Sequence, residues 1–313
     1  MDRVTYIISR LLQLIPTIII VMVLVFFLTR IIPGNPARLM LGIQAKPEDV
    51  ARFTKQWGLD QPIYIQFGVW VANLLKGDLG NSLVMRVPII QILVDRLPVT
   101  LFMTFYAVAI AIVTAIPLAV ISAFNKDSWI DQLIRALNIS ILSTPNFWIG
   151  ILLLIAFGVL IPLFKIGGVG PTFTDRLRDL FLPALTLALN MSSTITRNLR
   201  DGLISMLNSD HVVFSRAKGL SDRKVIIGHV LRNALIPTTT LIGIYLSWMV
   251  GGSMIIESVF GIPGIGSMMI QGILGRDYPI VQILTLVYAL FVSLIYLITD
   301  LLYSFLDPRV SLS

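Results

Sequence analysis

The 313-residue sequence contains no cysteine, two histidines and few charged residues. Without cysteine the chain forms no disulfide bond and offers no thiolate ligand or cysteine nucleophile. Charged residues make up 13% of the chain, whereas soluble domains contain about 25%. Hydrophobic residues make up 56%, so the composition predicts a protein whose main solvent is lipid.

The sequence also lacks the motifs of several enzyme classes. It has no G-x-x-x-x-G-K-[ST] phosphate loop, so this chain does not bind and hydrolyse ATP by that mechanism. Neither H-E-x-x-H nor G-x-S-x-G occurs. For His211 and His229, which share one basic loop, we expect solvated or helix-packed side chains rather than metal ligands. We assign no catalytic residue, no metal site and no bound cofactor to this chain.

The net charge of +7 admits two interpretations. A basic surface can bind nucleic acid, but basic residues that flank apolar segments are typical of cytoplasmic membrane loops. We predict contact with a lipid bilayer and none with nucleic acid. Arg3 and Arg10 precede an apolar run over 11–28 that resembles a secretion signal, but no small-residue cleavage site follows it. We therefore expect a retained anchor helix.

Six apolar stretches have lengths that suit membrane-spanning helices, which need about 20 residues to cross about 30 Å of hydrocarbon. The stretches are 11–29, 97–124, 136–164, 180–196, 233–256 and 280–299, and none contains Asp, Glu, Lys, Arg or His. The fourth is the shortest. Pro16, Pro117, Pro145, Pro183 and Pro237 lie within these stretches and predict kinks. The sequence thus predicts an all-α polytopic membrane protein with six transmembrane helices, forming one domain over 1–313.

Basic residues are concentrated in the loops on one side of these stretches. Six crossings place both termini on that side, which the positive-inside rule assigns to the cytoplasm. The basic residues there are Arg3, Arg10, Lys126, Arg135, Arg197, Arg200, Arg216, Lys218, Arg223, Lys224, Arg232 and Arg309. The short loops opposite contain Lys165, Arg176, Arg178 and Arg276. We predict cytoplasmic N- and C-termini.

The first loop, over about 30–96, is long enough to need structure outside the membrane. Pro47 and the two acidic residues after it are typical of a first helical turn, and Gly58 is a stop signal. A second apolar helix face runs through Ile63, Phe67, Trp70 and Leu74. We predict two interfacial helices that cover the outer mouth of the bundle, with direct contact to substrate as the alternative.

The cytoplasmic loop over about 197–232 is basic and too long for a simple connection. Residues 208–210 can cap one helix, Gly219 ends it, and residues 221–222 start a second helix. The pattern predicts a helix, a glycine corner and a second helix, which together form a docking knob. A solvated basic loop is the alternative, although such a loop does not need regular apolar faces.

The six predicted spans contain no ionisable residue. Ion-coupled carriers generally need such residues within the bilayer, so the sequence disfavours a proton- or cation-driven carrier. A passive channel and a permease driven by a separate motor remain, and the docking knob favours the permease. A membrane-embedded enzyme is a third possibility, but we find no convincing reacting side chain within or beside the spans.

The docking knob carries a recognisable sequence pattern. Arg216-Ala217-Lys218-Gly219-Leu220-Ser221, followed by His229-Val230-Leu231-Arg232-Asn233-Ala234-Leu235-Ile236-Pro237, resembles the ABC importer permeases of the dipeptide, oligopeptide and nickel family. Further segments similar to this family are Leu14-Ile15-Pro16-Thr17, Pro33-Gly34-Asn35-Pro36-Ala37-Arg38, Leu59-Asp60-Gln61-Pro62, Gly77-Asp78-Leu79-Gly80-Asn81-Ser82, Pro145-Asn146-Phe147, Gly251-Gly252-Ser253, Ile256-Glu257-Ser258-Val259-Phe260, Pro263-Gly264-Ile265-Gly266, Arg276-Asp277-Tyr278-Pro279 and Leu306-Asp307-Pro308-Arg309. The resemblance covers nearly the whole chain and is to the subunit with the longer first external loop.

The resemblance implies a type I ABC importer in a bacterial inner membrane. The chain would form half of a path for di- or oligopeptides, with nickel or another small peptide-like solute as the alternative. Its partners would be a second, related permease, two ATPase subunits that bind ATP and magnesium, and an extracytoplasmic substrate-binding protein. The ATPase-coupling residues would be Arg216, Ala217, Lys218, Gly219, Leu220 and Ser221. The general importer motif is only partly present, because its Glu position is apolar or Ser215.

Glu257 is the only acidic residue between Asp222 and Asp277. It lies where the fifth predicted span reaches the outer interface. We expect it to anchor the loop over 261–266 near the mouth of the path, with a hydrated helix end as the alternative. The candidate outer gate consists of Glu257, Gly261, Pro263 and Gly264.

Overall fold

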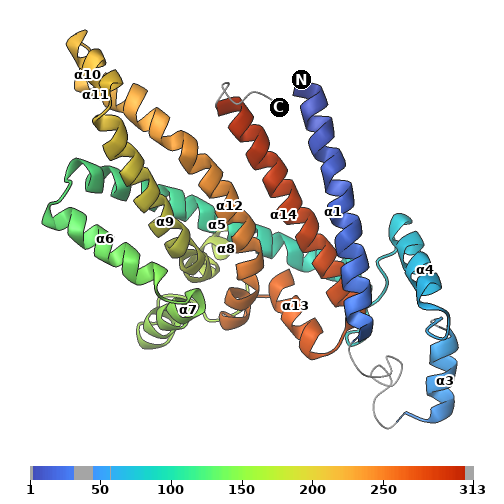
Figure 1. Ribbon diagram of the computed structural model, residues 1–313. Coiled ribbons are helices and arrows are strands. Elements are labelled where there is room, and N and C mark those ends of the chain that lie inside the picture. Colours follow the sequence, from blue (N-terminus) through green and yellow to red (C-terminus); the bar gives the residue numbers. More distant parts are fainter. Residues whose placement is uncertain (1–2, 32–44, 57, 307–313) are drawn as a thin grey trace.

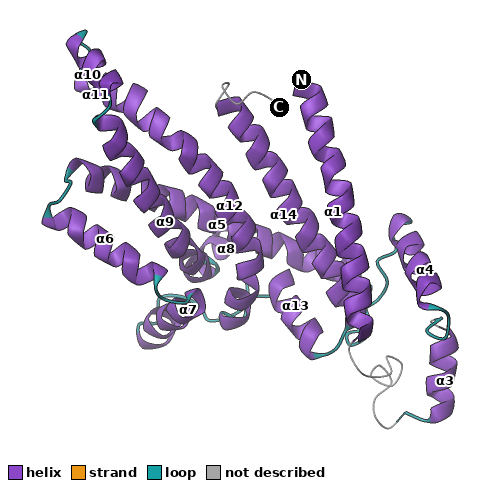
Figure 2. Cartoon of the chain, viewed as in Figure 1, coloured by secondary structure: helices purple, strands orange, loops and turns teal. Residues whose placement is uncertain are grey.

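The computed structural model describes residues 3–31, 45–56 and 58–306. Within these ranges the regular structure is helical, and the only β pairing is one isolated antiparallel bridge between Asn81 and Pro88 (Figure 2). The predicted all-α class is therefore confirmed. The family-like segment 33–38 and residues 307–309 lie outside the described residues, as do the side chains of Arg3 and Arg10.

The helices form one bundle with extensions at both ends. In chain order they are α1 (Arg3–Ile31), α3 (Pro47–Gln56), α4 (Ile63–Leu75), α5 (Ile89–Phe124), α6 (Trp129–Leu142), α7 (Asn146–Leu154), the π-helix η1 (Ile155–Leu160), α8 (Phe173–Asp179), α9 (Phe181–Leu207), α10 (Asp210–Ala217), α11 (Asp222–Val225), the π-helix η2 (Ile226–Leu231), α12 (Arg232–Val259), α13 (Ile265–Leu274) and α14 (Tyr278–Leu306). Figure 1 shows α10, α11, the start of α1 and the end of α14 at one end of the molecule, whereas α3, α7 and α13 lie at the other end.

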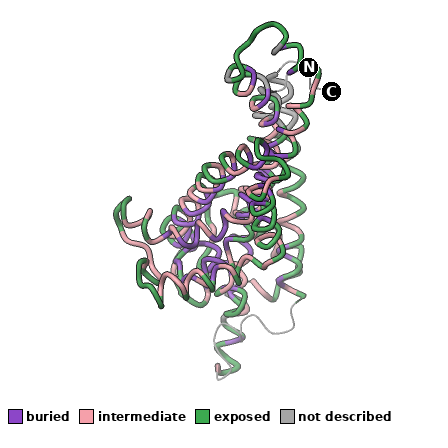
Figure 3. Tube along the Cα trace, turned by 90° about the vertical axis from the view of Figure 1, so that its left-hand side faces the viewer, coloured by how far each residue is buried: buried purple, intermediate pink, exposed green. Residues whose placement is uncertain are grey.

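The centre of the bundle is the contact between α5 and α9. Small residues recur at every fourth position of α5, on the face that packs against α9, and each of these side chains is 0% exposed: Ala107, Ala111, Ala115 and Ala119. Residues four apart lie on one side of a helix, and small side chains let a neighbouring helix backbone approach closely. Buried Ala184, Ala188 and Met191 of α9 belong to the same core cluster as Ala107, Ala111 and Ala115. Figure 3 shows the buried residues concentrated in this central part of the molecule.

The third predicted span, 136–164, is not one helix. α6 ends at Leu142, and the next helical segment, Asn146–Leu160, is bent from it by 102°. The break follows from Pro145, which cannot donate a backbone hydrogen bond and disfavours helical geometry at Thr144. We expected a kink at this proline, and the structure has a sharp turn instead.

Four helices of the described residues are long and apolar enough to cross a membrane: Leu11–Ile31 of α1, all of α5, Pro237–Val259 of α12 and Tyr278–Leu301 of α14. The bent pair raises this number to five. The fourth predicted span forms part of α9, a 27-residue helix that contains too many polar residues to meet the same criterion. The structure thus differs from the prediction at the third and fourth spans, while the polytopic all-α class is confirmed.

The region between α1 and α5 contains the two predicted helices, α3 and α4, and Gly58 between them has a left-handed φ of +61°. α4 packs on α1 through aromatic contacts, with the Phe26 ring 5.1 Å from that of Phe67 and 5.5 Å from that of Trp70. α5 begins at Ile89, before the predicted end of the first loop near 96. Its first turns carry charged residues on an outward face, where a helix tolerates them.

Candidate functional site

The docking knob consists of α10, residues 218–221, α11 and η2. It stands at the far end of the long helices α9 and α12 (Figure 1). Gly219 has a φ of +78°, and, its chain neighbours apart, no heavy atom of the described residues lies within 4 Å of the position that its Cβ would occupy. The Leu220 N–H donates to the Ser215 carbonyl at 3.4 Å, the long-range bond of a Schellman helix end. The structure therefore contains the predicted helix, glycine corner and second helix.

The inner face of the docking knob packs against the bundle. Val212, Val225 and Val230 are at most 2% exposed and share a core cluster with Ala119 and Ala123 of α5 and Leu199, Leu203 and Ala234 of α9 and α12. Because these contacts join the knob to three long helices, the knob cannot shift without pressing on them.

The outer face of the docking knob presents apolar side chains to the surroundings. Val213 is 60% exposed, Phe214 68% and Ile227 55%. Of the six predicted coupling residues, Ala217, Lys218, Gly219, Leu220 and Ser221 are exposed, and Arg216 lies in α10. Contiguous exposed apolar residues on a polar segment are typical of a protein-binding surface.

A buried ion pair lies where α5, α6 and α9 meet. The Arg200 guanidinium donates to both carboxylate oxygens of Asp131, at 2.7 and 2.6 Å, and the Ser122 hydroxyl donates to the same carboxylate. Asp131 and Ser122 are 0% exposed and Arg200 is 9% exposed. We did not predict this pair, because in the sequence each partner is typical of a charged residue that flanks a membrane span.

Glu257 is fully buried near the end of α12. Its carboxylate accepts hydrogen bonds from the Thr100 hydroxyl at 2.7 Å and from the Ser267 N–H at 2.8 Å. The Thr100 hydroxyl in turn accepts from the Ile265 N–H at 3.0 Å. Two free N–H groups at the start of α13 are thus satisfied from α12 and α5. The alternative of a hydrated helix end does not fit this burial.

The other residues of the candidate outer gate surround this carboxylate. A Cβ at Gly264 would lie 2.3 Å from Glu257 Oε2, so only glycine fits there. Gly261 has a φ of +62°, and its carbonyl accepts from the Gly168 N–H at 3.1 Å. Pro263 is exposed. The geometry brings Glu257, Gly261 and Gly264 into one loop region, while their part in gating stays a prediction.

A second buried carboxylate, Asp277, holds the hairpin between Asn81 and Pro88, the two residues of the isolated β bridge before α5. It accepts from the Ser82 hydroxyl and from the N–H groups of Leu83 at 3.0 Å and Val84 at 3.1 Å. Asp277 is 0% exposed. This contact joins two segments that we recognised only as separate family-like motifs, and nothing in either segment indicates that they meet.

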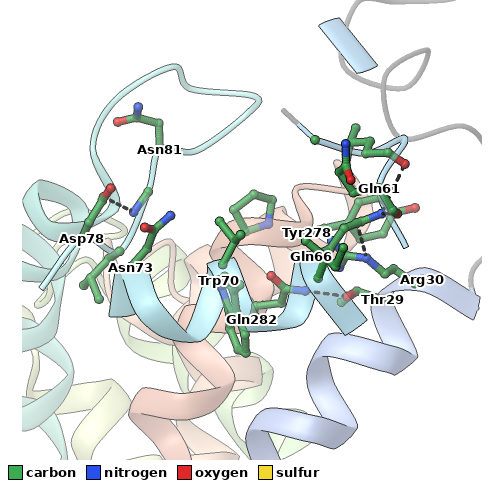
Figure 4. Close-up of a pocket in the computed structure, with 17 residues that line it drawn as sticks. Thr29, Arg30, Gln61, Gln66, Trp70, Asn73, Asp78, Asn81, Tyr278 and Gln282 are labelled. Carbon is green, nitrogen blue, oxygen red and sulfur yellow. Dashed lines mark hydrogen bonds between the residues drawn. The ribbon is translucent and has the colours of Figure 1, made fainter. Parts of the chain in front are cut away.

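A pocket of about 250 Å³ lies beside this hairpin, between α1, α4 and the start of α14 (Figure 4). The Arg30 guanidinium donates to Gln66 Oε1 at 2.9 Å, and the Gln282 amide donates to the Thr29 hydroxyl at 2.7 Å. Arg30 also lies over the Phe26 ring, 3.8 Å from its centroid. The first contact joins α4 to α1, and the second joins α14 to α1.

A polar stripe follows one side of α9. Asn190, Thr194 and Asn198 recur at every fourth position and are half-buried or exposed. The Thr194 hydroxyl lies 2.8 Å from the Tyr245 hydroxyl of α12. Next to the stripe is a cavity of about 500 Å³ between α9 and α12, lined by uncharged residues that include Ser205, Asn233, Thr238 and Thr240. Partly exposed polar groups on a membrane helix are expected to face water or protein rather than lipid.

Comparison with known families identifies the class of protein. Residues 115–312 match the family described as the binding-protein-dependent transport system inner membrane component, and residues 3–104 match the N-terminal membrane component of the same systems. The chain belongs to this family and is a permease subunit of a binding-protein-dependent ABC importer. Within the described residues, no group of three or more His, Asp and Glu side chains is arranged to hold a metal ion.

Similar proteins extend over the whole chain. A peptide transport system permease of Brucella suis is 39% identical over 97% of this chain and 98% of its own length. The glutathione transport system permease GsiC of Escherichia coli is 36% identical over the same shares. Among solved structures, an inward-facing form of the MetNI methionine ABC transporter matches with a TM-score of 0.59 and 18% identity, over 70% of this chain and 97% of the matched chain. This last likeness concerns the fold alone.

Proposed function

We propose that this chain forms half of the translocation path of an ATP-driven importer for di- and oligopeptides, and that its docking knob contacts an ATPase subunit. The observation that carries the proposal is that the knob has two apolar faces. One face packs on three long helices, and the apolar residues of the other face are exposed. Two ATPase subunits would bind ATP and magnesium. Their closure would press on the Gly219 corner and thereby tilt α9 and α12.

The path would run along the polar stripe of α9. Its neutral side chains and the adjacent uncharged cavity offer hydrogen bonds without selecting for charge. A second, related permease would cover this side of the bundle and form the other half of the path. The relatives named for peptide and glutathione transport support a peptide-like cargo, which an external binding protein would select and deliver.

The chain would lie in a bacterial inner membrane with both termini in the cytoplasm. The start of α1, the end of α14 and the docking knob lie at one end of the bundle, where an ATPase would bind (Figure 1). The broken pair α6–α7 and the more polar α9 would supply the third and fourth crossings, so that six crossings would return the chain to its starting side.

Reconstituted transport tests this proposal. The purified complex in liposomes should take up a labelled dipeptide only when ATP is inside and the binding protein is outside. A complex with a catalytically inactive ATPase subunit serves as the control and should not transport. Uptake that needs no nucleotide would show a passive channel and refute the proposal.

A further inference from the structure

α6 is held to the rest of the bundle at its first turn. Asp131 forms the bidentate ion pair with Arg200 of α9 and accepts hydrogen bonds from the Ser122 hydroxyl of α5 and from the Asp127 N–H at 3.0 Å. Bidentate Arg–carboxylate pairs fix geometry as well as charge, and loss of one partner leaves the other charge buried. The ion pair is therefore a rigid joint between α6 and α9.

Beyond this joint one face of α6 borders a cavity. A cavity of about 200 Å³ lies between α5, α6 and α9, and the α6 residues that line it are Ile134, Leu137, Asn138 and Ile141. On the other side, Leu133 is 50% exposed and Ile139 61%. Because one face of α6 borders this cavity and the other carries exposed apolar side chains, the ion pair, rather than side-chain packing alone, fixes α6 to α9.

The far end of α6 leads to the candidate outer gate. After the 102° bend, α7 packs at Gly150 between α9 and the end of α12, where a Cβ would lie 3.2 Å from Thr186 of α9 and 3.2 Å from the ring of Phe260, which follows α12. Phe260 directly precedes Gly261, whose carbonyl accepts the hydrogen bond from Gly168. A displacement of α7 therefore presses on the loop that carries the gate residues.

We propose that Asp131 and Arg200 are positioning residues that make α6 and α7 move with the docking knob, so that the motion of the knob reaches the outer loop at Gly261. Arg200 lies on α9 close to Leu199 and Leu203, which pack against the knob. The ion pair transfers the movement of α9 to α6, and the bend redirects it toward α7 and Phe260. This proposal rests on the proposed function, because it assumes that the knob is the part an ATPase moves.

Two substitutions test the joint against a matched control. Asp131→Asn keeps the side-chain shape but removes the charge, and Arg200→Lys keeps the charge but removes the bidentate geometry. Asp201→Asn is the control, because Asp201 contacts the same guanidinium at 2.9 Å, with its own side chain 61% exposed. In assembled complexes, dipeptide taken up per ATP hydrolysed should fall about fivefold or more in the first two variants and change by less than about twofold in the control.

A distance measurement separates coupling from stability. Spin labels at Val213→Cys in the knob and Trp148→Cys in α7 use exposed positions of a cysteine-free chain. In the wild-type background the distance distribution should stay narrow with and without ATP, and Asp131→Asn should broaden it. Unchanged transport per ATP together with an unchanged distribution would overturn the proposal, as would a loss of uptake that only follows the loss of assembled complex.

If Asp131→Asn does not assemble, Ser122→Ala removes only the hydroxyl that donates to Asp131. It should broaden the same distribution to a smaller extent, and a wild-type distribution would then count against the proposal. The proposed function fails separately, when the wild-type complex shows no ATP-dependent uptake at all. The spin-label distances can be measured without transport, so failure of the proposed function can be distinguished from failure of the proposal for Asp131 and Arg200.

Discussion

Substitution of Gly219 by valine tests whether the docking knob couples ATP hydrolysis to transport. The φ of +78° places Gly219 in the left-handed region, where a residue with a Cβ costs about 1–2 kcal/mol. An added Cβ would not clash with other described residues, since none has a heavy atom within 4 Å of the Cβ position, its chain neighbours apart. The whole effect therefore comes from backbone strain at the corner, and the membrane-buried helices stay unaffected.

A strain of about 1–2 kcal/mol lowers the population of the native corner conformation, relative to distorted conformations, by about 5- to 30-fold. Transport that depends on the native corner should fall by a similar factor, while membrane insertion stays at the wild-type level. We expect Gly219→Val to reach the membrane and to lose substrate-stimulated ATP hydrolysis and uptake together.

Two controls separate backbone strain from the added side chain. Gly228 of η2 also has open space at its Cβ position, but its φ is outside the left-handed region, so Gly228→Ala should behave as wild type, whereas Gly219→Ala should not. Asparagine tolerates left-handed geometry better than most residues, so Gly219→Asn should recover part of the coupling. Membrane abundance, stimulated ATPase and dipeptide uptake are measured on the same preparations. Coupling in Gly219→Val equal to that of wild type would show that the knob does not transmit force.

Two further predictions concern the outer region and the orientation. Glu257→Gln should impair transport without preventing assembly. The amide nitrogen would face the Ser267 N–H or the Thr100 hydroxyl, and an unsatisfied buried donor costs about 1–3 kcal/mol. Uptake at the wild-type level in Glu257→Gln would show that Glu257 has no part in the gate. Cysteines at the exposed positions Arg52 and Lys218 should react differently with an impermeant thiol reagent in intact cells, with position 52 labelled and position 218 silent. The reverse pattern would contradict the predicted topology.

The short-range features of the chain were predictable because each depends on neighbouring residues. Apolar runs and their lengths indicated the membrane helices, and the glycine corners at Gly58 and Gly219 follow from helix-stop signals, which need no knowledge of distant contacts. The structure differs from the prediction where polarity alone set a boundary. α5 begins before its charged residues because they lie on its outward face, and α9 carries polar residues inside the bundle.

By itself, the sequence determined the membrane class, the all-α fold, the two helices between α1 and α5, and the shape of the docking knob, because hydropathy, caps and glycine geometry act locally. Only the tertiary structure decided which polar groups meet. Asp131 pairs with a residue 69 positions away, Thr100 with one 157 away and Ser82 with one 195 away. Such pairings depend on how helices pack, since a buried charge requires a partner but does not specify where in the chain that partner lies.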